Sequence, residues 1–248
     1  MSNKAIIFDL DGTIYYGNKL INGVTDVLER IKQLNYEIIF FTNNSSKNRE
    51  EVFIKLQKLG IETSLNKVYN SSYATAVYLN ENKLKNIFLI GTSSFKKELS
   101  LFDINFVEPD RAEAVIVGLD LKFSYNDIAQ GLIALQNGAK LIASNVDKNF
   151  SAEYGILKPG CNAIVASLIG SCSKKISPII IGKPNTYMLE IICNEWKLTN
   201  NDIWVIGDRE ESDIAMAKNF GCKHILVGKN GLFIENIVER IENECFRV

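Results

Sequence analysis

The sequence predicts an α/β protein whose main domain is a doubly wound parallel sheet and which carries a second, inserted α/β domain. Three observations support this prediction. Short apolar runs alternate with segments of helical periodicity near the N-terminus, the C-terminal part repeats the alternation, and the middle of the chain has a strand and helix pattern of its own. Such alternation is typical of βαβ units, in which helices cover both faces of a parallel sheet.

The N-terminal elements follow from their residue patterns. Residues 4–9 and 37–42 are short apolar runs, which predict buried strands. Apolar residues at helical spacing predict helices over 24–35 and 47–59, and Gly60 is a typical C-terminal stop for the second helix. The first quarter of the chain is therefore predicted to contribute two strands and two helices to the main domain.

Three more apolar runs occur in the C-terminal part, and each ends in glycine. They are residues 178–182, 203–207 and 224–228, with helix-like stretches between them. We expect these runs to be further strands of the main sheet, because they repeat the pattern of the N-terminal strands.

The middle of the chain has its own alternation. Its predicted strands lie near 86–90, 113–117 and 140–143, and its predicted helices near 93–101, 125–137 and 161–170. We therefore predict an inserted domain over 77–177, with residues 1–76 and 178–248 together forming the main domain.

Composition excludes several classes of protein. The 248 residues are 46% hydrophobic and 23% charged, with a formal net charge of −1. These values are ordinary for a globular protein, and they give no bulk field for nucleic acid or membrane binding. No apolar run approaches the roughly 18 residues of a membrane span. Five scattered cysteines without a CxxC pair favour reduced thiols, and the sequence has no signal-peptide pattern, so we expect a cytoplasmic protein.

The first candidate site is a pair of acids at the end of the first predicted strand. Asp9 and Asp11 are two residues apart, so their side chains project to the same face of an extended chain. Two nearby carboxylates repel one another unless a cation or a shared proton relieves the repulsion. Gly12 follows and lets the backbone turn close to a ligand. Two solvated surface acids are the alternative, but the buried strand before them and the Gly-Thr after them favour a site.

Polar groups of other kinds follow the remaining strands. The run Thr42–Ser46 offers hydroxyl and amide groups at the start of a helix, where anions bind well. Capping by Ser45 or Ser46 explains only part of this run. Lys183 follows the run 178–182 and could serve as a point charge for a phosphate. Asp208 ends another apolar strand, and Asp213 opens the next helix.

Together these groups predict a phosphoryl-transfer site at the carboxyl edge of one sheet, where open α/β sheets bind their ligands. Hard carboxylate oxygens suit Mg²⁺, and a lysine with Mg²⁺ can clamp the oxygens of a phosphoryl group. An aspartate can attack phosphorus, and a second acid can protonate the leaving oxygen and later activate water. The predicted reaction is hydrolysis of a phosphate ester.

The ordered motifs resemble the haloacid dehalogenase-like (HAD) phosphatases, with a Rossmann-like core, over essentially the whole chain. Two further segments resemble the NagD-type branch, which includes the 4-nitrophenyl phosphatases. In chain order the motifs and these two segments are Asp9–Thr13, Thr42–Asn44, Ser144–Asp147, Lys158–Gly160, Gly182–Pro184, and Asp208 with Asp213. This resemblance implies a Mg²⁺-dependent phosphatase of small phosphate monoesters, of nucleotide, phosphoglycolate or sugar phosphate type, with the inserted domain as a cap.

The resemblance also implies residue roles. Asp9 would be the nucleophile and a Mg²⁺ ligand, and Asp11 the acid/base, with its main-chain carbonyl also on Mg²⁺. Lys183 would orient the nucleophile and help to bind the phosphoryl group. The remaining roles are phosphoryl binding by Thr42 and Asn43, metal ligation by Asp208, and support behind the ligands by Asp213.

Two residues of the inserted domain are candidates for substrate contact. Asn145 and Asp147 follow the predicted strand 140–143 and could face the substrate, although a role within their own loop is the alternative. Tyr15 and Tyr16 could flank the cleft or pack against the core, and the sequence does not decide between these roles. The implied partner is a small phosphorylated metabolite, with no nucleic acid or membrane, and a homodimer through the cap is compatible with the resemblance.

Two other functions are alternatives for this set of residues. A receiver-type signalling module also places aspartates, a hydroxyl and a lysine on an α/β sheet, but its acidic pair and its acceptor aspartate lie on different strands, whereas Asp9 and Asp11 share one. The second alternative is a catalytically inactive HAD-fold protein used for binding or regulation. A suitable residue at every catalytic position argues against it.

Overall fold

The computed structural model describes residues 4–151, 156–229 and 231–245, and it divides the chain into two compact units. The first unit comprises Met1–Thr42, Phe53–Tyr69 and Lys183–Val248, and the second comprises Asn43–Val52 and Asn70–Gly182. Each unit is built on a five-stranded sheet with helices, so the fold is α/β as predicted. The predicted domain boundaries at 76/77 and 177/178 stay a prediction.

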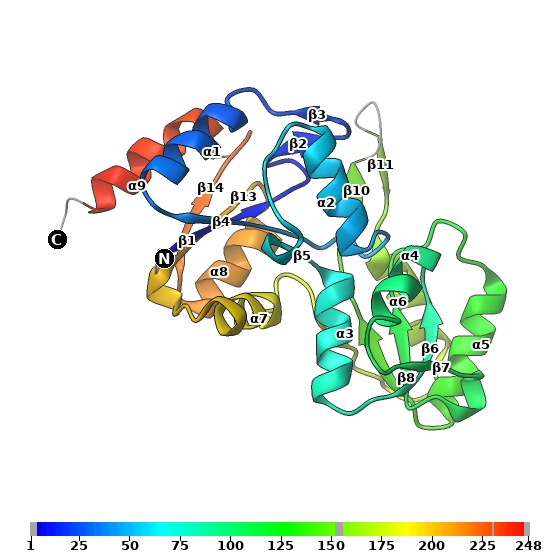
Figure 1. Cartoon of the computed structure of the whole chain (residues 1–248). Helices are drawn as coiled ribbons and strands as arrows, with labels where there is room; N and C mark the ends of the chain where they lie inside the picture. The colour runs from blue at the N-terminus through cyan, green and yellow to red at the C-terminus, as the bar shows by residue number, and fades with distance from the viewer. Residues whose placement is uncertain (1–3, 152–155, 230, 246–248) are drawn as a thin grey trace. The chain divides into compact units, whose positions relative to one another are not determined.

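The first unit is organised around the strand order β14-β13-β1-β4-β5 (Figure 1). β1 pairs in parallel with both β4 and β13, and β13 pairs in parallel with β14. All five residues of β1 are buried, because both faces of this central strand are covered. The strands are β1 (Ala5–Asp9), β4 (Glu37–Thr42), β5 (Val68–Asn70), β13 (Ile203–Gly207) and β14 (Lys223–Leu226).

Helices cover both faces of this sheet (Figure 1). α1 packs against α9 on one face, and α7 and α8 lie on the other. A short hairpin, β2 (Tyr15–Tyr16) with β3 (Lys19–Leu20), follows the first strand. The helices are α1 (Val24–Gln33), α7 (Tyr187–Trp196), α8 (Ala215–Phe220) and α9 (Ile237–Cys245), and α2 (Arg49–Lys58) runs from the second unit into the first.

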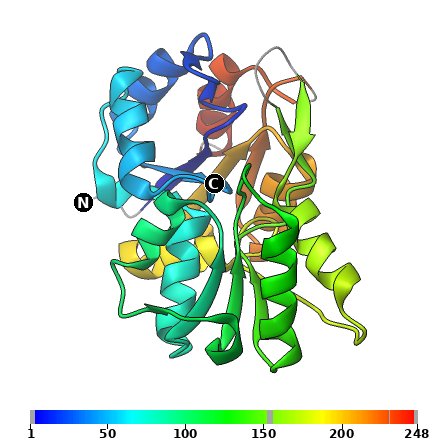
Figure 2. The ribbon, with the colours of Figure 1, turned by 90° about the vertical axis from the view of Figure 1, so that its right-hand side faces the viewer.

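The second unit has the strand order β12-β9-β8-β6-β7, with parallel pairing throughout. α3 and α4 flank one face of this sheet and α5 and α6 the other (Figure 2). The strands are β6 (Asn86–Ile90), β7 (Asn105–Phe106), β8 (Ala114–Val117), β9 (Lys140–Ala143) and β12 (Ile179–Ile180). The helices are α3 (Ser71–Glu81), α4 (Ser93–Leu99), α5 (Tyr125–Gln136) and α6 (Cys161–Ser171), with a hairpin of β10 (Asn149–Ser151) and β11 (Leu157–Pro159).

One predicted strand lies in a different sheet from the one expected. The run 178–182 forms β12, which pairs with β9 in the second sheet and not with the main sheet. The fifth strand of the first sheet is instead β5, which the sequence did not predict. Apolar periodicity indicates that a segment is a strand, but it does not show which sheet the strand joins. The three residues of β5 are too few to show a period at all. Among the described residues, none of the helices combines the length and the apolar character needed to cross a bilayer.

Candidate active site

Two candidate acids meet at the carboxyl edge of the first sheet because their strands are neighbours. β1 ends at Asp9, and the parallel register pairs Phe8 with Ile206, so Asp208 follows the adjacent strand end. One carboxylate oxygen from each of Asp9, Asp208 and Asp213 lies within 4.8 Å of the others. The structure therefore brings these three acids into one cluster.

Lys183 lies inside this acidic cluster. Its ammonium Nζ is 2.5 Å from Oδ1 of Asp9 and 2.6 Å from Oδ1 of Asp213. The side chain is almost fully buried, and the ammonium also lies 4.4 Å from the centre of the Phe41 ring. A buried ammonium needs charged partners, and the two carboxylates supply them.

Asp213 is the most enclosed acid of the cluster, with no exposed surface. It lies in a single π-helical turn, Glu210–Ile214, directly after β13. Its Oδ2 accepts the backbone N–H of Arg209 at 3.1 Å, while its Oδ1 accepts from Lys183. π-Helical turns often occur at functional sites, and this one directs the Asp213 carboxylate at the lysine.

Gly12 lets Asp208 approach the backbone of the first motif. The glycine has a φ of +98°, a left-handed conformation that other residues rarely adopt. A Cβ at this position would lie 2.2 Å from Oδ2 of Asp208. A side chain at residue 12 would therefore displace the Asp208 carboxylate from the cluster.

Burial dominates the electrostatics of the cluster. Desolvation raises the pKa of Asp9 well above its usual range, opposed by Lys183 and reinforced by the charges of Asp213 and Asp208. Desolvation and the Asp213 charge raise the pKa of Asp208 to about 6. Burial alone would lower the pKa of Lys183, but the charges of Asp213 and Asp9 raise it above its ordinary value. The lysine therefore stays charged, while two of the acids resist ionisation.

The cluster fits a divalent cation. Three carboxyl groups surround one ammonium, so a second positive charge would favour the ionised forms of the acids. Among the described residues, none donates a hydrogen bond to Oδ1 of Asp208, although that atom is buried. Carboxylate oxygens without hydrogen-bond donors are suitable ligands for a hard cation. Asp9 and Asp208 could hold such a cation, whereas both oxygens of the Asp213 carboxylate already accept hydrogen bonds, from Lys183 and from the Arg209 N–H.

Asp11 is exposed, and the neighbouring hairpin holds its side chain. The hydroxyl of Tyr15 hydrogen-bonds to the Asp11 carboxyl, and the backbone N–H of Gly12 donates to the Tyr15 carbonyl at 2.9 Å. The buried Tyr15 ring lies 3.5 Å below the ammonium of Lys55. Tyr16, by contrast, is 60% exposed. The structure therefore places the two tyrosines in different environments, which the sequence could not separate because both follow the motif directly.

Thr42 and Asn43 lie where the chain passes from one unit to the other. Thr42 ends β4 and is buried, and Phe41 pairs with Asp9 in the neighbouring strand. Asn43 belongs to the second unit, where its Nδ2 donates to Oδ1 of Asp147 at 3.0 Å. Asn145 donates to the Asn43 carbonyl at 2.8 Å. The structure thus brings Asn43, Asn145 and Asp147 together, and their contact with substrate stays a prediction.

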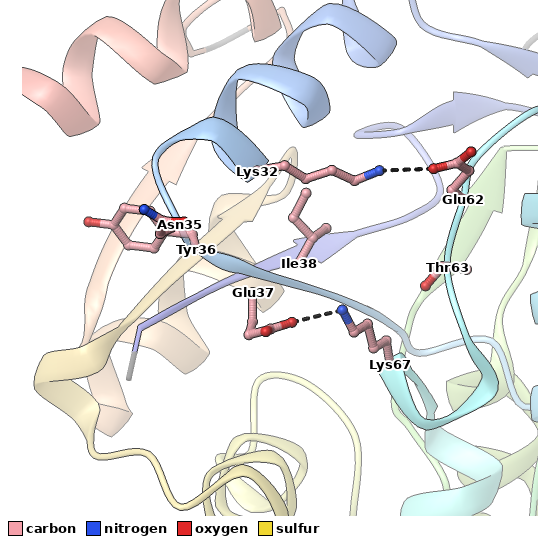
Figure 3. Close-up of a pocket in the computed structure, with 8 residues that line it drawn as sticks. All are labelled: Lys32, Asn35, Tyr36, Glu37, Ile38, Glu62, Thr63 and Lys67. Carbon is pink, nitrogen blue, oxygen red and sulfur yellow. Dashed lines mark hydrogen bonds and ion pairs between the residues drawn. The ribbon is translucent and has the colours of Figure 1, made fainter. Parts of the chain in front are cut away.

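A surface hollow of about 590 Å³ lies elsewhere on the first unit (Figure 3). It is beside Glu37, the first residue of β4, whereas the candidate site is at the other end of that strand. Figure 3 shows two ion pairs across it, Lys32–Glu62 at 3.5 Å and Lys67–Glu37 at 2.7 Å. None of the predicted site residues lines this hollow.

Known proteins match this chain consistently over nearly its whole length. A haloacid dehalogenase-like hydrolase model matches residues 6–105, and a HAD-hydrolase-like model matches 180–236. The chain is 34% identical to the sugar-phosphatase AraL of Bacillus subtilis, over 92% of this chain and 84% of that protein. It is 31% identical to the chloroplastic phosphoglycolate phosphatase 1A of Arabidopsis thaliana, over 98% and 73%. The p-nitrophenyl phosphatase structure from Archaeoglobus fulgidus matches with a TM-score of 0.86 and 28% identity, over 98% and 93%.

Proposed function

We propose that this chain, which belongs to the haloacid dehalogenase-like hydrolases and is a phosphatase of their NagD and 4-nitrophenyl phosphatase branch, hydrolyses small phosphate monoesters through a phosphoryl group carried on Asp9. The observation that carries this proposal is the buried Lys183, bonded to both Asp9 and Asp213. A lysine held beside one carboxylate at a strand end can orient that carboxylate and neutralise the charge that develops on a phosphoryl group.

The proposed reaction has two steps. A carboxylate oxygen of Asp9 attacks phosphorus, the ester P–O bond breaks, and Asp11 gives its proton to the leaving oxygen. Water then attacks the same phosphorus while Asp11 takes up a proton from it. The bond between Asp9 and phosphorus breaks, inorganic phosphate leaves, and both aspartates return to their starting states. Thr42 and the backbone of Asn43 would hold the phosphoryl oxygens.

We also propose Mg²⁺ as the cofactor. Asp9, Asp208 and the main-chain carbonyl of Asp11 would hold it, with Asp213 behind them. Bound there, the ion would supply positive charge to the phosphoryl oxygens. Two observations support this proposal: three carboxyl groups surround a single ammonium, and no described residue donates a hydrogen bond to the buried Oδ1 of Asp208.

Removal of the metal is the direct test of this cofactor. EDTA is expected to silence hydrolysis of 4-nitrophenyl phosphate, and added Mg²⁺ to restore it. Turnover that persists after exhaustive chelation and dialysis would contradict the proposed site. Catalysis in repeated cycles, after Mg²⁺ is restored, would also exclude the inactive binding protein and the single-phosphorylation signalling module.

Metal affinity is expected to depend on pH through Asp208. The pKa of Asp208 is raised to about 6, so the folded protein holds the carboxyl proton of Asp208 more tightly than the unfolded chain does. A cation that binds this carboxylate must displace the proton. We therefore expect Mg²⁺ to bind about tenfold more weakly at pH 5 than at pH 7. Because the pKa of Asp208 is higher in the folded than in the unfolded state, the metal-free protein should lose stability as the pH rises through about 6.

Isothermal titration of the metal-free protein with Mg²⁺ at both pH values measures this effect without relying on activity. A parallel urea denaturation series checks the stability trend. Equal Mg²⁺ affinities at pH 5 and pH 7 would contradict this prediction, because they would show that Mg²⁺ binding does not require a carboxyl group to lose its proton.

Asp11 is expected to act in both proton transfers. Asp11→Asn should lower kcat by about 10²–10⁴-fold, the usual range for loss of a general acid or base. The kcat/KM defect should be smaller for 4-nitrophenyl phosphate than for an alkyl phosphate, because nitrophenolate leaves without a proton. Steady-state kinetics on the two substrates measures the difference. Equal defects on both would mean that Asp11 does not protonate the leaving group.

The substrate is proposed from the relatives. Since the matched proteins are named as sugar and phosphoglycolate phosphatases, we propose a small sugar phosphate or phosphoglycolate as the substrate class. Nucleoside monophosphates belong in the same phosphate-release panel, ranked by kcat/KM. A flat ranking, with no substrate preferred by more than about tenfold, would argue against a dedicated metabolite.

We place the enzyme in the cytoplasm. Four described cysteines, Cys161, Cys172, Cys193 and Cys222, are free thiols, and free thiols are typical of a reducing compartment. A homodimer through the inserted domain stays a prediction that gel filtration with light scattering can test.

A further inference from the structure

We propose that Asn145 and Asp147 are positioning residues of the phosphatase: with Ser71, they fix the backbone and side chain of Asn43, and so the loop that receives the phosphoryl group. We call these four residues the Asn43 cluster. The proposal rests on the proposed function, because it concerns the loop assigned there to the phosphoryl oxygens. It differs from direct substrate contact by Asn145 and Asp147, which the sequence predicted.

Two donors fix the carbonyl of Asn43. The hydroxyl of Ser71 donates to this oxygen at 2.6 Å, and Nδ2 of Asn145 donates to it at 2.8 Å. A carbonyl oxygen has two lone pairs, so both are used. All three residues are buried. The peptide plane that follows Asn43 is therefore held on both sides, in a region where an unmade hydrogen bond is costly.

The Asn43 side chain is held as well. Its Nδ2 donates to the Asp147 carboxylate at 3.0 Å, a charge-assisted bond. Its Oδ1 lies against the backbone of Gly182, where an added Cβ would be only 2.4 Å away. The amide therefore has a defined orientation, with nitrogen towards the carboxylate and oxygen towards the glycine.

Asn145 connects the two halves of the Asn43 cluster. While its Nδ2 binds the Asn43 carbonyl, its Oδ1 accepts the backbone N–H of Asp147 at 3.2 Å. Only 3% of the residue is exposed. Both ends of its amide are thus engaged inside the protein. Asn145 would have to break these bonds to touch a substrate, which favours a role through Asn43.

The rest of the loop is tied down by the same unit. Oγ of Ser45 accepts the N–H of Leu119 at 3.1 Å, and Thr92 donates its hydroxyl to the carbonyl of Ser46 at 3.0 Å. The backbone N–H of Arg49 donates to the buried Glu98 carboxylate at 2.6 Å. These bonds fix the later part of the loop. The position of Asn43, at its start, then depends on the other three residues of the Asn43 cluster. Donors held in place before reaction stabilise a transition state better than donors that must be ordered.

Asp147→Ala removes the acceptor of the Asn43 side chain without touching the aspartates of the first unit. We expect kcat/KM for 4-nitrophenyl phosphate to fall about 10–100-fold, because small misplacements of a binding group cost up to about that factor. Asp147→Asn keeps an acceptor oxygen, and its kcat/KM should be at least about tenfold higher than that of Asp147→Ala. Asp110→Ala, at an exposed acid of the same unit, is the matched control and should behave as the wild type.

Two readouts separate positioning from substrate contact. If Asp147 acts through Asn43, Asp147→Ala should weaken competitive inhibition by inorganic phosphate about as much as it lowers kcat/KM. The kcat/KM defect should also be the same for substrates with different leaving groups. If Asp147 instead touches the leaving group, phosphate inhibition stays unchanged and the defect varies with the substrate. Either of those two results would overturn the proposal.

A double-mutant cycle completes the test. Asn43→Ala combined with Asp147→Ala should cost no more than Asn43→Ala alone, since residues that act through one contact are not additive. Additive losses would contradict the proposal, and so would an Asp147→Asn variant as impaired as Asp147→Ala. An inactive wild-type protein, or a fully active Asp9→Asn variant, would instead refute the proposed function, so the two failures are distinguishable.

Discussion

Asp9→Asn is expected to abolish turnover, with kcat reduced by about 10³–10⁶-fold, the scale of losses when a catalytic nucleophile is removed. Asparagine has the shape of aspartate but an amide in place of the attacking carboxylate. Lys183 would remain in place through its 2.6 Å contact with Asp213. Phosphate release from 4-nitrophenyl phosphate, measured with excess Mg²⁺, gives the residual kcat.

The same variant is expected to remain folded. Burial raises the pKa of Asp9, which means that folding disfavours its charged form. A neutral side chain at this position should therefore leave the melting temperature in EDTA equal to or above that of the wild type. A folded variant that keeps more than a few per cent of wild-type kcat would remove Asp9 from the mechanism.

Lys183→Met is expected to have the largest effect on stability. The substitution keeps Asp9, Asp208 and Asp213 together but removes the buried ammonium that binds two of them. Removing one partner of a buried charged pair typically costs about 3–5 kcal/mol. Urea denaturation at pH 7 in EDTA measures the loss of free energy of unfolding. Lys122→Met, at an exposed lysine, is the matched control.

The stability deficit of Lys183→Met should shrink on acidification. A raised carboxyl pKa means that the folded state binds the proton more tightly, so lowering the pH below about 6, the value for Asp208, favours folding. Without the opposing charge of Lys183, the pKa of Asp9 should rise further. A Lys183→Met protein as stable as the wild type at pH 7, or one whose deficit grows at pH 5, would contradict these electrostatics.

The sequence shows which acids follow predicted strands, because short apolar runs mark where those strands end. β1 and β4 run over 5–9 and 37–42, close to the predicted ranges, and Asp9 and Asp208 meet because their parallel strands are neighbours. Lys183 meets the same acids although the strand before it belongs to the other sheet. The expectation that a strand of the main sheet precedes Lys183 is wrong, because Ile179–Ile180 pairs with the strand Lys140–Ala143 of the second sheet.

The roles of the other residues could not be predicted because they depend on long-range contacts. Asp147 is 104 residues from Asn43, and no local pattern indicates that their side chains meet. Tyr15 and Tyr16 are adjacent and identical in type, yet only Tyr15 turns inwards to hydrogen-bond to Asp11. The strand register of a short hairpin decides which of its side chains faces the motif. A two-residue strand shows too little alternation for the sequence to reveal this register.

The proposed mechanism depends most on a phosphoryl group bonded to Asp9, and rapid acid quenching tests for this intermediate directly. Asp11→Asn protein, mixed with 4-nitrophenyl phosphate and Mg²⁺, should retain the intermediate because its hydrolysis needs a base. Peptide mass spectrometry after the quench should find one added phosphoryl group on the Asp9 peptide, and none in protein that also carries Asp9→Asn. A stoichiometric burst of nitrophenol without any phosphorylated peptide, or a phosphoryl group on a different residue, would contradict the account.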